Sequence, residues 1–245
     1  MKNIKMILEY DGSKYQGWQK LGNTENTIQS KIEKTIKLIL NEDISLIGSG
    51  RTDAGVHAKG QVANFKTNSE ITMDDFIYYM NIYLPKDIVV KDAKEASERF
   101  HARYNAKSKV YSYYIYNDFY QSPFYRKYSY HISDKLNIDN MLNASKLLVG
   151  KHDYKAFSSV KSKNKSTIKT VHSIEIEHKA PFICIRFEAD GFLYNMVRIL
   201  AGTIIEVGKG IRDINTIYDL FDSKNRAEAG FTAPAHGLFL EEVKY

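Results

Sequence analysis

The segment GSGRTDAGVHAKG, from Gly48 to Gly60, contains the residues best suited to chemistry. Asp53 provides a carboxylate, and Arg51, two positions earlier, provides a cation. Glycines make such a segment costly to order, but they let a bulky partner approach the backbone closely. The segment follows a strand-like run, and loops at element ends commonly carry functional side chains. The sequence therefore indicates a candidate site around Asp53, although an N-cap, a loop ion pair or a plain turn has the same composition.

Several common chemistries do not fit this loop. A dinucleotide-binding fingerprint needs glycine where Asp53 stands. A P-loop needs lysine followed by serine or threonine, where this sequence has Val56 and His57. The sequence has no Gly-x-Ser-x-Gly elbow, and His57 has no second histidine at helical spacing and no paired cysteine. The pattern predicts neither a nucleotide cofactor nor a metal site.

The distribution of charged and aromatic residues favours a nucleic-acid partner. The formal net charge is +6, and the chain has 18 tyrosines. Four lysines and no acid occur in 161–169, and cations alternate with aromatics in 101–117. Cations follow phosphates, and aromatic rings stack on bases. A solvated lysine loop beside a tyrosine-rich strand would give the same composition, so this alternative stays open.

The sequence also favours a soluble protein of the cytoplasm. Cys184 is the only cysteine, so no disulfide can form within the chain, as suits a reducing compartment. The first apolar run is three residues long and meets Glu9 and Asp11, which is unlike a signal peptide. No run approaches the roughly 20 apolar residues of a membrane span.

The first half of the chain predicts the order β-α-β-β-α-β. Asn26, with Gln29 as its partner, is expected to cap a helix whose isoleucines at 28, 32, 36 and 39 share one face. Thr72 is expected to cap a second helix, which ends before Pro85. The expected strands are 5–10, 44–48, 61–67 and 87–93. This order is the ferredoxin-like pattern.

The second half predicts the same order again. The expected strands are 109–117, two within 172–190 around a turn at 179–181, and 237–245, and the expected helices are 137–150 and 192–210. A short additional helix is expected near 214–220. The fold class is therefore α+β, with an N-terminal domain at 1–105 that carries the loop 48–60 and a C-terminal domain at 106–245.

Five blocks of the sequence, in order, resemble the TruA-type tRNA pseudouridine synthases. The most specific is GRTDAGVHA at 50–58. The others are YDGSKYQGWQ at 10–19, RFHARYNAKSKVYSYYIYN at 99–117, FLYNMVRILAG at 192–202 and AHGLFLEEV at 235–243. The resemblance covers essentially the whole chain. It implies two ferredoxin-like domains that share an extended mixed or antiparallel sheet, with a basic RNA-binding cleft between them.

The resemblance also implies a reaction and its partners. The family converts uridine to pseudouridine in the anticodon stem-loop of tRNA, at positions 38, 39 and 40, and works as a homodimer. The reaction breaks the N1–C1′ bond, turns the base and joins C5 to C1′. It is an isomerisation without redox change, so no cofactor is expected.

The resemblance assigns roles to particular residues. Asp53 matches the catalytic carboxylate, and Arg51 matches the arginine that assists base flipping. Tyr111 matches the tyrosine that stacks on the flipped uracil, although Tyr113, Tyr114 and Tyr116 are equally eligible by composition. Arg198 matches a helix arginine that would pair with the catalytic aspartate and keep it ionised, although by itself it is typical of an exposed helix position.

Phosphate contacts are expected from Arg103, Lys107, Lys109 and the lysines of 161–169. His57 is expected to be structural or to contact RNA. Asn195 stands where the family commonly has histidine, and the run at 168–171 also departs from the family pattern. Because these departures concern RNA handling more than the reaction, a synthase that acts on another RNA such as ribosomal RNA stays open. The aromatic run at 109–116 resembles the aromatic strand of an RNA-recognition motif, so an RNA-binding module without catalysis stays open as well.

Overall fold

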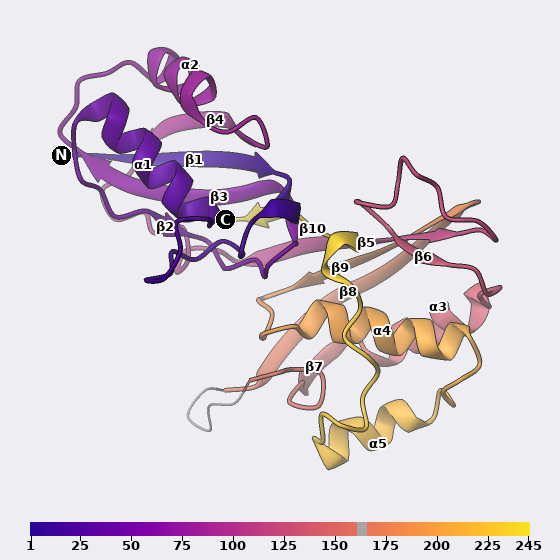
Figure 1. The fold of residues 1–245 in the computed structure, drawn as a ribbon. Coiled ribbons are helices and arrows are strands. Elements are labelled where there is room, and N and C mark those ends of the chain that lie inside the picture. The colour runs from indigo at the N-terminus through magenta and orange to yellow at the C-terminus, as the bar shows by residue number, and fades with distance from the viewer. Residues whose placement is uncertain (161–165) are drawn as a thin grey trace. The chain divides into compact units, whose positions relative to one another are not determined.

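The computed structural model describes residues 1–160 and 166–245. The chain forms two compact units (Figure 1). Unit 1 consists of Met1–Lys107 together with Phe239–Tyr245, and unit 2 consists of Ser108–Leu238. The lysine-rich segment proposed for phosphate contacts lies outside the described residues at positions 161–165.

Unit 1 has the strand order of a ferredoxin-like fold. Its elements are β1 (Lys2–Tyr10), α1 (Ile28–Leu40), β2 (Ile47–Gly48), β3 (His57–Thr67), α2 (Met73–Tyr83), β4 (Ile88–Ala96) and β10 (Leu238–Lys244). Strands β4, β1, β3 and β2 are neighbours in that order, and each pair is antiparallel. The β-α-β-β-α-β order predicted from the first half of the sequence is confirmed.

The apolar periodicity explains how unit 1 forms its core. Ile4, Met6 and Leu8 alternate along β1 and are buried, as expected when one face of a sheet is covered. The isoleucines of α1 at 28, 32 and 36 are also buried, because they lie on one side of the helix. Ile39, predicted for the same face, is only half-buried near the end of the helix. The cap of this helix is Thr27, which accepts a hydrogen bond from the Ser30 amide, and not Asn26 as predicted.

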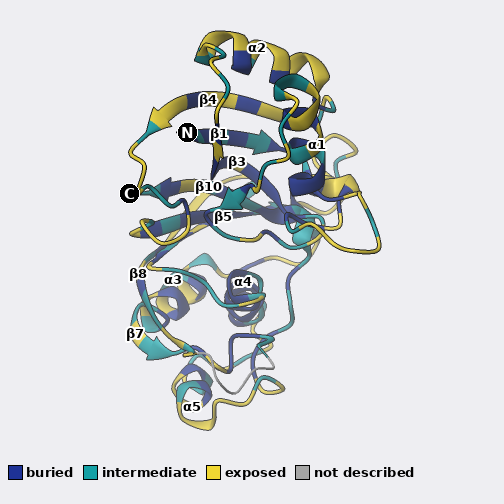
Figure 2. Cartoon of the chain, turned by 90° about the vertical axis from the view of Figure 1, so that its left-hand side faces the viewer, coloured by how far each residue is buried: buried dark blue, intermediate teal, exposed yellow. Residues whose placement is uncertain are grey.

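Helix α2 has one buried stripe and a broad exposed face (Figure 2). Thr72 caps it as predicted, since its side chain accepts from the Asp75 amide, and the helix ends before Pro85. Phe76 and Met80 are buried. A helix covering one face of a sheet needs only such a stripe toward the core.

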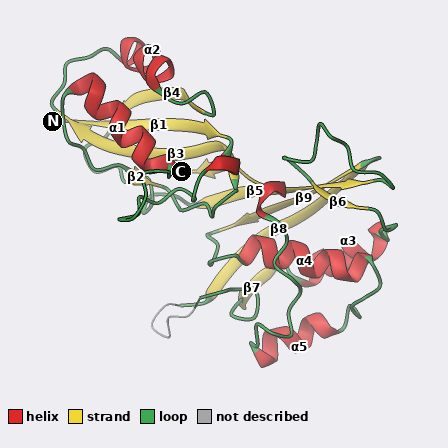
Figure 3. Cartoon of the chain, viewed as in Figure 1, coloured by secondary structure: helices red, strands yellow, loops and turns green. Residues whose placement is uncertain are grey.

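Unit 2, like unit 1, is built from helices and strands (Figure 3). Its elements are β5 (Ser108–Asn117), β6 (Tyr130–Ile132), α3 (Ile138–Leu147), β7 (Gly150–Asp153), β8 (Ile168–Lys179), β9 (Phe182–Ala189), α4 (Met196–Gly208) and α5 (Thr216–Ser223). Strands β5, β9, β8 and β7 are neighbours in that order and pair antiparallel. The predicted hairpin around 179–181 is confirmed, whereas the short strands β6 and β7 were not predicted.

Helix α4 lies in the centre of unit 2, and nearly all of its residues are buried. Gly202 lets another backbone segment pass against it, because a Cβ there would be 1.9 Å from the Phe231 carbonyl oxygen. None of the helices in the two described ranges is both long and apolar enough to cross a membrane.

The division of the chain differs from the predicted one at its end. Strand β10 was expected in the C-terminal domain, but Phe239–Tyr245 belongs to unit 1. Phe239 and Leu240 pair in parallel with His57 and Ala58 of β3. Leu240 is buried, and the Glu241 carboxylate lies 3.0 Å from the Lys59 ammonium group. These contacts join the strand to unit 1 although the intervening unit 2 separates them in sequence.

Candidate active site

Asp53 lies in the loop 49–56, between β2 and β3 of unit 1. Arg51 is exposed, Thr52 is buried and Asp53 is half-buried. The Val56 amide donates to the Asp53 carbonyl oxygen at 3.1 Å. Gly55 has φ +79°, a left-handed conformation that suits glycine. The loop therefore turns tightly just after Asp53.

The segment 10–18 holds this loop through its backbone. The Trp18 amide donates to the Thr52 carbonyl oxygen at 3.0 Å. A Cβ on Gly12 would be 2.0 Å from the Val56 carbonyl oxygen, and one on Gly17 would be 2.8 Å from that of Thr52. The two glycines thus allow two backbone segments to touch. The spacing of Gly12 and Gly17 in the N-terminal block is the sequence signal for this contact.

His57 is buried directly after the loop. Its Nδ1 accepts from the Gly12 amide at 3.1 Å and lies 3.1 Å from an Asp11 carboxylate oxygen. The ring also stacks on Phe239 of β10, with centroids 4.5 Å apart. These contacts support the structural role that the sequence left open for His57.

The candidate tyrosines of β5 occupy different environments. Tyr111 is buried and meets Phe192 edge-on, with ring centroids 5.2 Å apart and planes at 87°. Tyr113 is also buried, and its hydroxyl donates to the Pro234 carbonyl oxygen at 2.9 Å. Tyr116 stacks on Tyr125, with centroids 5.8 Å apart. Residues equivalent by composition are thus distinguished by their neighbours.

Arg198 in α4 is held in a defined orientation and is partly buried. Its Nε donates to the Ala233 carbonyl oxygen at 2.7 Å, and its Nη1 donates to Asn195 Oδ1 at 3.2 Å. The Ala233 amide donates back to the Arg198 carbonyl oxygen at 3.1 Å. Such charge-assisted bonds fix a guanidinium more firmly than solvent exposure would. Arg198 is therefore not the freely exposed helix residue that its position alone suggested.

Asn195 has a role that the sequence did not reveal. It has φ +62° at the start of α4, a conformation that asparagine tolerates better than most residues. Its Oδ1 accepts from Arg198, and its Nδ2 donates to Ser159 Oγ at 3.1 Å. The departure from the family pattern at this position thus concerns a residue that orients Arg198, and not only RNA handling.

The predicted residues are divided between the units. Arg51, Asp53, Arg103 and Lys107 belong to unit 1, whereas Lys109, Tyr111 and Arg198 belong to unit 2. Within unit 1, the structure brings Arg51 and Asp53 together on one loop. Arg103 and Lys107 have exposed side chains in the segment that follows β4.

Comparison with known proteins shows the family to which the chain belongs. The model of the tRNA pseudouridine synthase family matches residues 6–105 and 144–245. "tRNA pseudouridine synthase A" of Bacillus sp. (strain KSM-64) is 52% identical over 245 residues, which is all of both chains. "tRNA pseudouridine synthase A" of Thermoanaerobacter sp. (strain X514) is 48% identical, and "tRNA pseudouridine synthase A 2" of Bacillus cereus (strain ZK / E33L) is 46% identical, each over the full length of both chains. The chain belongs to the tRNA pseudouridine synthase family.

Proposed function

We propose that this chain isomerises uridine to pseudouridine in tRNA, at positions 38, 39 and 40 of the anticodon stem-loop. Family membership over the full length supports the reaction and the substrate. The observation that carries the proposal is the half-buried Asp53 on a loop fixed by a second backbone segment. A single cysteine fits an enzyme of the reducing cytoplasm.

Asp53 provides the one carboxylate that the reaction requires. The N1–C1′ bond breaks, the base turns and C5 joins C1′; the proton on C5 passes to solvent, and N1, released from C1′, takes up a proton. No electrons are gained or lost overall. The carboxylate acts as a nucleophile at the sugar or the base, or it stabilises and deprotonates a glycal-like species. Each of these roles needs the carboxylate at a fixed place beside the nucleotide.

Arg51 assists the exposure of the target base. A uridine stacked inside a stem must rotate out before its glycosidic bond can be reached. Arg51 is exposed two residues before Asp53, so its side chain is available to occupy the vacated space. Because the glycines around it have no side chains, the RNA backbone can come close.

Residues of both units contribute to substrate handling in this proposal. Tyr111 stacks on the flipped uracil, and Arg198 supplies a fixed positive charge to the same reaction. Arg103, Lys107 and Lys109 contact phosphates, because cations provide most of the affinity of a protein for a nucleic-acid backbone.

The two alternatives have less support. The relatives named above are called tRNA pseudouridine synthases, which favours tRNA over ribosomal RNA as the substrate. A binding module without catalysis has no use for a carboxylate placed beside RNA phosphates, because like charges repel.

The decisive experiment uses an anticodon stem-loop transcript that carries [5-³H]uridine. Tritium release is followed with the wild type and with Asp53→Asn, and the product is mapped by reverse transcription after carbodiimide treatment. We expect release by the wild type alone, with stops at positions 38 to 40. Release by Asp53→Asn at the wild-type rate would refute the catalytic role, and release only from ribosomal RNA fragments would replace the substrate.

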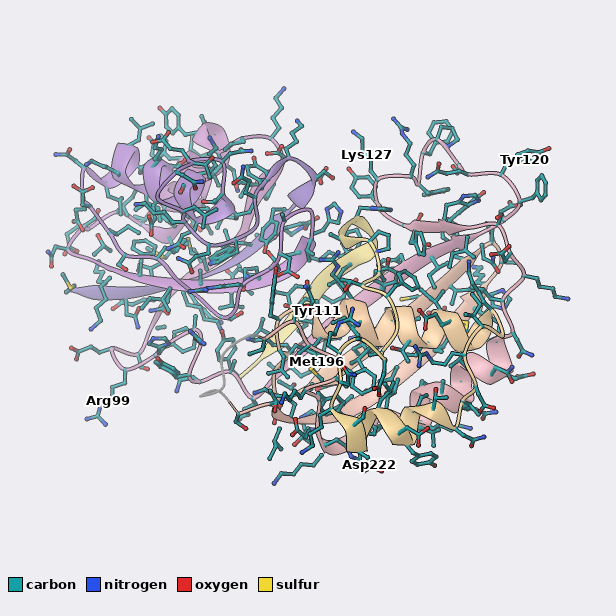
Figure 4. The ribbon with its side chains drawn as sticks, turned by 60° about the horizontal axis from the view of Figure 1, so that its bottom comes forward. Arg99, Tyr111, Tyr120, Lys127, Met196 and Asp222 are labelled. Atoms are coloured by element: carbon teal, nitrogen blue, oxygen red, sulfur yellow. The ribbon has the colours of Figure 1, made fainter. Side chains whose placement is uncertain are left out.

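We also propose that the working unit is a homodimer, which contacts its partner through residues 118–129 of unit 2. This segment lies between β5 and β6 without a helix or strand (Figure 3). Its exposed aromatic residues are Phe119, Tyr120, Phe124, Tyr125 and Tyr128. Figure 4 shows Tyr120 and Lys127 projecting from it. Exposed apolar surface of this kind, with aromatic residues and arginine, is typical of protein interfaces.

The oligomeric state tests this surface. Sedimentation equilibrium of the wild type is expected to give the mass of two chains, and Phe124→Asp is expected to give the mass of one. Phe124 is 83% exposed, so its replacement should leave the fold of unit 2 intact. An unchanged dimer would exclude Phe124 from the interface, and an unchanged mass with weaker tRNA binding would assign the segment to RNA.

A further inference from the structure

A buried polar network lies under the loop that carries Asp53. Its side chains are Tyr10 of β1, Ser49 and Thr52 of the loop, and Gln61 of β3, with exposed fractions of 3%, 0%, 5% and 0%. Burial of hydroxyl and amide groups costs free energy unless each finds a hydrogen-bond partner. A network of this size at one end of a sheet therefore needs an explanation.

The hydrogen bonds of the network reach the loop on both sides of Arg51. Gln61 Nε2 donates to the Gly50 carbonyl oxygen at 3.0 Å, just before Arg51. The Tyr10 hydroxyl and Thr52 Oγ1 share a hydrogen bond at 2.8 Å, just after it. The strands thus hold the loop at Gly50 and Thr52, the two residues that flank Arg51. Asp53 directly follows Thr52.

The other bonds make the network one connected unit. Ser49 Oγ donates to Gln61 Oε1 at 2.7 Å, and the Val62 amide donates to the same oxygen at 3.1 Å. A side-chain hydrogen bond also joins Tyr10 and Gln61. Connected buried hydrogen bonds strengthen one another and specify a single arrangement.

The network stands on two paired strands, next to a register irregularity between Leu8 and Tyr10 of β1. Gln61 of β3 pairs with Leu8 of β1, and Tyr10 of β1 pairs with Ala58 of β3. Residues held by packing on strands place a neighbouring functional group more accurately than a loop alone can.

We propose that Tyr10 and Gln61 are positioning residues that fix Asp53, through Thr52 and Gly50, in the geometry needed for attack on the nucleotide. This inference rests on the proposed function for the role of Asp53. Neither residue contacts the substrate. Their contribution is the accuracy with which the carboxylate is held, since displacement of a reacting group by about 1 Å can reduce a rate about 100-fold.

The network itself takes no part in proton transfer. Burial raises the pKa of the Tyr10 hydroxyl far above its ordinary value, against the opposing effects of its hydrogen bonds to Thr52 and Gln61. Tyr10 therefore keeps its proton at neutral pH, and the serine, threonine and glutamine side chains carry no group that titrates there. A positional role is what remains for these groups.

Removal of single hydroxyl groups tests the proposal. Tyr10→Phe and Thr52→Val each delete one hydroxyl with little change in volume, and Thr52→Ser keeps it. Single-turnover tritium release is measured at saturating tRNA, with the tRNA dissociation constant measured separately. We expect Tyr10→Phe and Thr52→Val to slow the single-turnover step about 10- to 100-fold, with the dissociation constant within about twofold of wild type. Thr52→Ser, which keeps the hydroxyl, should retain the wild-type rate.

Tyr154→Phe is the matched control. Tyr154 is fully buried in unit 2, and its hydroxyl donates to the Leu148 and Gly150 carbonyl oxygens at 2.9 and 3.0 Å. The Tyr154→Phe variant loses a buried hydroxyl that does not contact the loop, so its single-turnover rate should equal that of wild type. An equal loss of rate in Tyr154→Phe and Tyr10→Phe would overturn the proposal, because general destabilisation would then explain both.

Hydrogen exchange of the loop separates this inference from the proposed function. Backbone amides at 50–56 are expected to exchange faster in Tyr10→Phe than in wild type, and at the wild-type rate in Tyr154→Phe. If the wild type releases no tritium from tRNA, the proposed function fails, while the exchange result still decides whether the network holds the loop. Unchanged exchange in Tyr10→Phe would overturn the inference whatever the activity.

Discussion

Single residues decide how closely the loop of Asp53 is held. Gly12 and Gly17 have no side chains, and for this reason the N-terminal segment can lie against the carbonyl groups of Val56 and Thr52. The placement of the loop thus depends on two residues without side chains.

Gly12→Ala should disturb the loop while leaving the rest of unit 1 folded. Its Cβ would lie 2.0 Å from the Val56 carbonyl oxygen, so one of the two backbone segments must move. We expect a loss of about 1–3 kcal/mol in the free energy of unfolding, as for an overpacked core, and a lower single-turnover rate. Urea denaturation and tritium release measure the two effects.

Gly22→Ala provides the comparison for this variant. A Cβ at Gly22 would have no heavy atom within 4 Å. Its stability should lie within about 0.5 kcal/mol of wild type, as for most surface substitutions. Equal behaviour of the two alanine variants would show that the close approach at Gly12 has no energetic consequence.

The amide of Asn195 should contribute to turnover through Arg198. Asn195→Gly removes the acceptor of Arg198 Nη1 and still permits the φ of +62°. A hydrogen bond to a charged group contributes about 1.5–3 kcal/mol, so we expect turnover to fall about tenfold or more if Arg198 serves the reaction. The measurement is single-turnover tritium release at saturating tRNA.

Ser159→Ala tests the other side of the same amide. It removes the acceptor of Asn195 Nδ2 but leaves the bond to Arg198 in place. A smaller effect than that of Asn195→Gly is expected. Full activity in both variants would assign Asn195 to the architecture of α4 alone.

At the scale of elements, the short 3-10 helix η2 (Ala235–Gly237) contains a histidine that should make the free energy of unfolding depend on pH. Burial lowers the pKa of the His236 imidazole, and the nearby positive charge of Arg198 lowers it further, while a hydrogen bond with the Ser129 backbone acts in the opposite direction. The folded protein therefore favours the neutral ring. Its contribution to stability is present above the ordinary value of about 6.5 and is lost as the pH falls through the lowered pKa.

His236→Gln should reduce this dependence. Urea midpoints of wild type and variant, measured between pH 8 and pH 5, are expected to converge as the pH falls. One proton changes the free energy of unfolding by at most about 1.4 kcal/mol per pH unit. Curves that run parallel over the whole range would show that His236 does not couple protonation to folding.

The scale of elements also shows what the sequence can predict. The isoleucine stripe of α1 and the alternation in β1 are local patterns, and the structure follows both, because each element has one face that must be buried. The observed cap of α1, Thr27, lies one residue after the predicted cap, Asn26. Both residue types cap helices well, and only the backbone conformation before the helix decides between them. Strands as short as β6 and β7 carry too few residues to show a period.

At the scale of the whole molecule, the main departure from prediction is β10. Its apolar alternation predicts a strand but does not indicate its partner. Pairing of Phe239 with His57 joins residues far apart in sequence, and no local pattern encodes such parallel contacts. The same reason hid the network of Tyr10 and Gln61, as each is an ordinary strand residue until the two strands are paired. The loop itself was predictable because its residue types are unusual.

Leu240→Ala tests the dependence of unit 1 on this distant strand. Leu240 is 1% exposed and pairs with Ala58. We expect a loss of about 2–5 kcal/mol in stability, together with faster hydrogen exchange at the start of β3. The measurements are urea denaturation and exchange followed by mass spectrometry.

Leu38→Ala is the control, because Leu38 is 68% exposed on α1. It should change stability by less than about 0.5 kcal/mol. Protection at the start of β3 that survives Leu240→Ala would mean that β10 adds little to unit 1.

The late position of β10 in the chain has a consequence for synthesis. The ribosome makes Phe239–Tyr245 after all of unit 2, although these residues complete unit 1. While unit 2 is being translated, the edge of β3 at His57 and Ala58 has not yet received its partner strand, and His57 lacks the ring on which it stacks. Domains generally fold in the order in which they emerge. Here the first unit to emerge is the last to be finished, so a nascent chain cannot complete the structure around Asp53 before unit 2 has been synthesised.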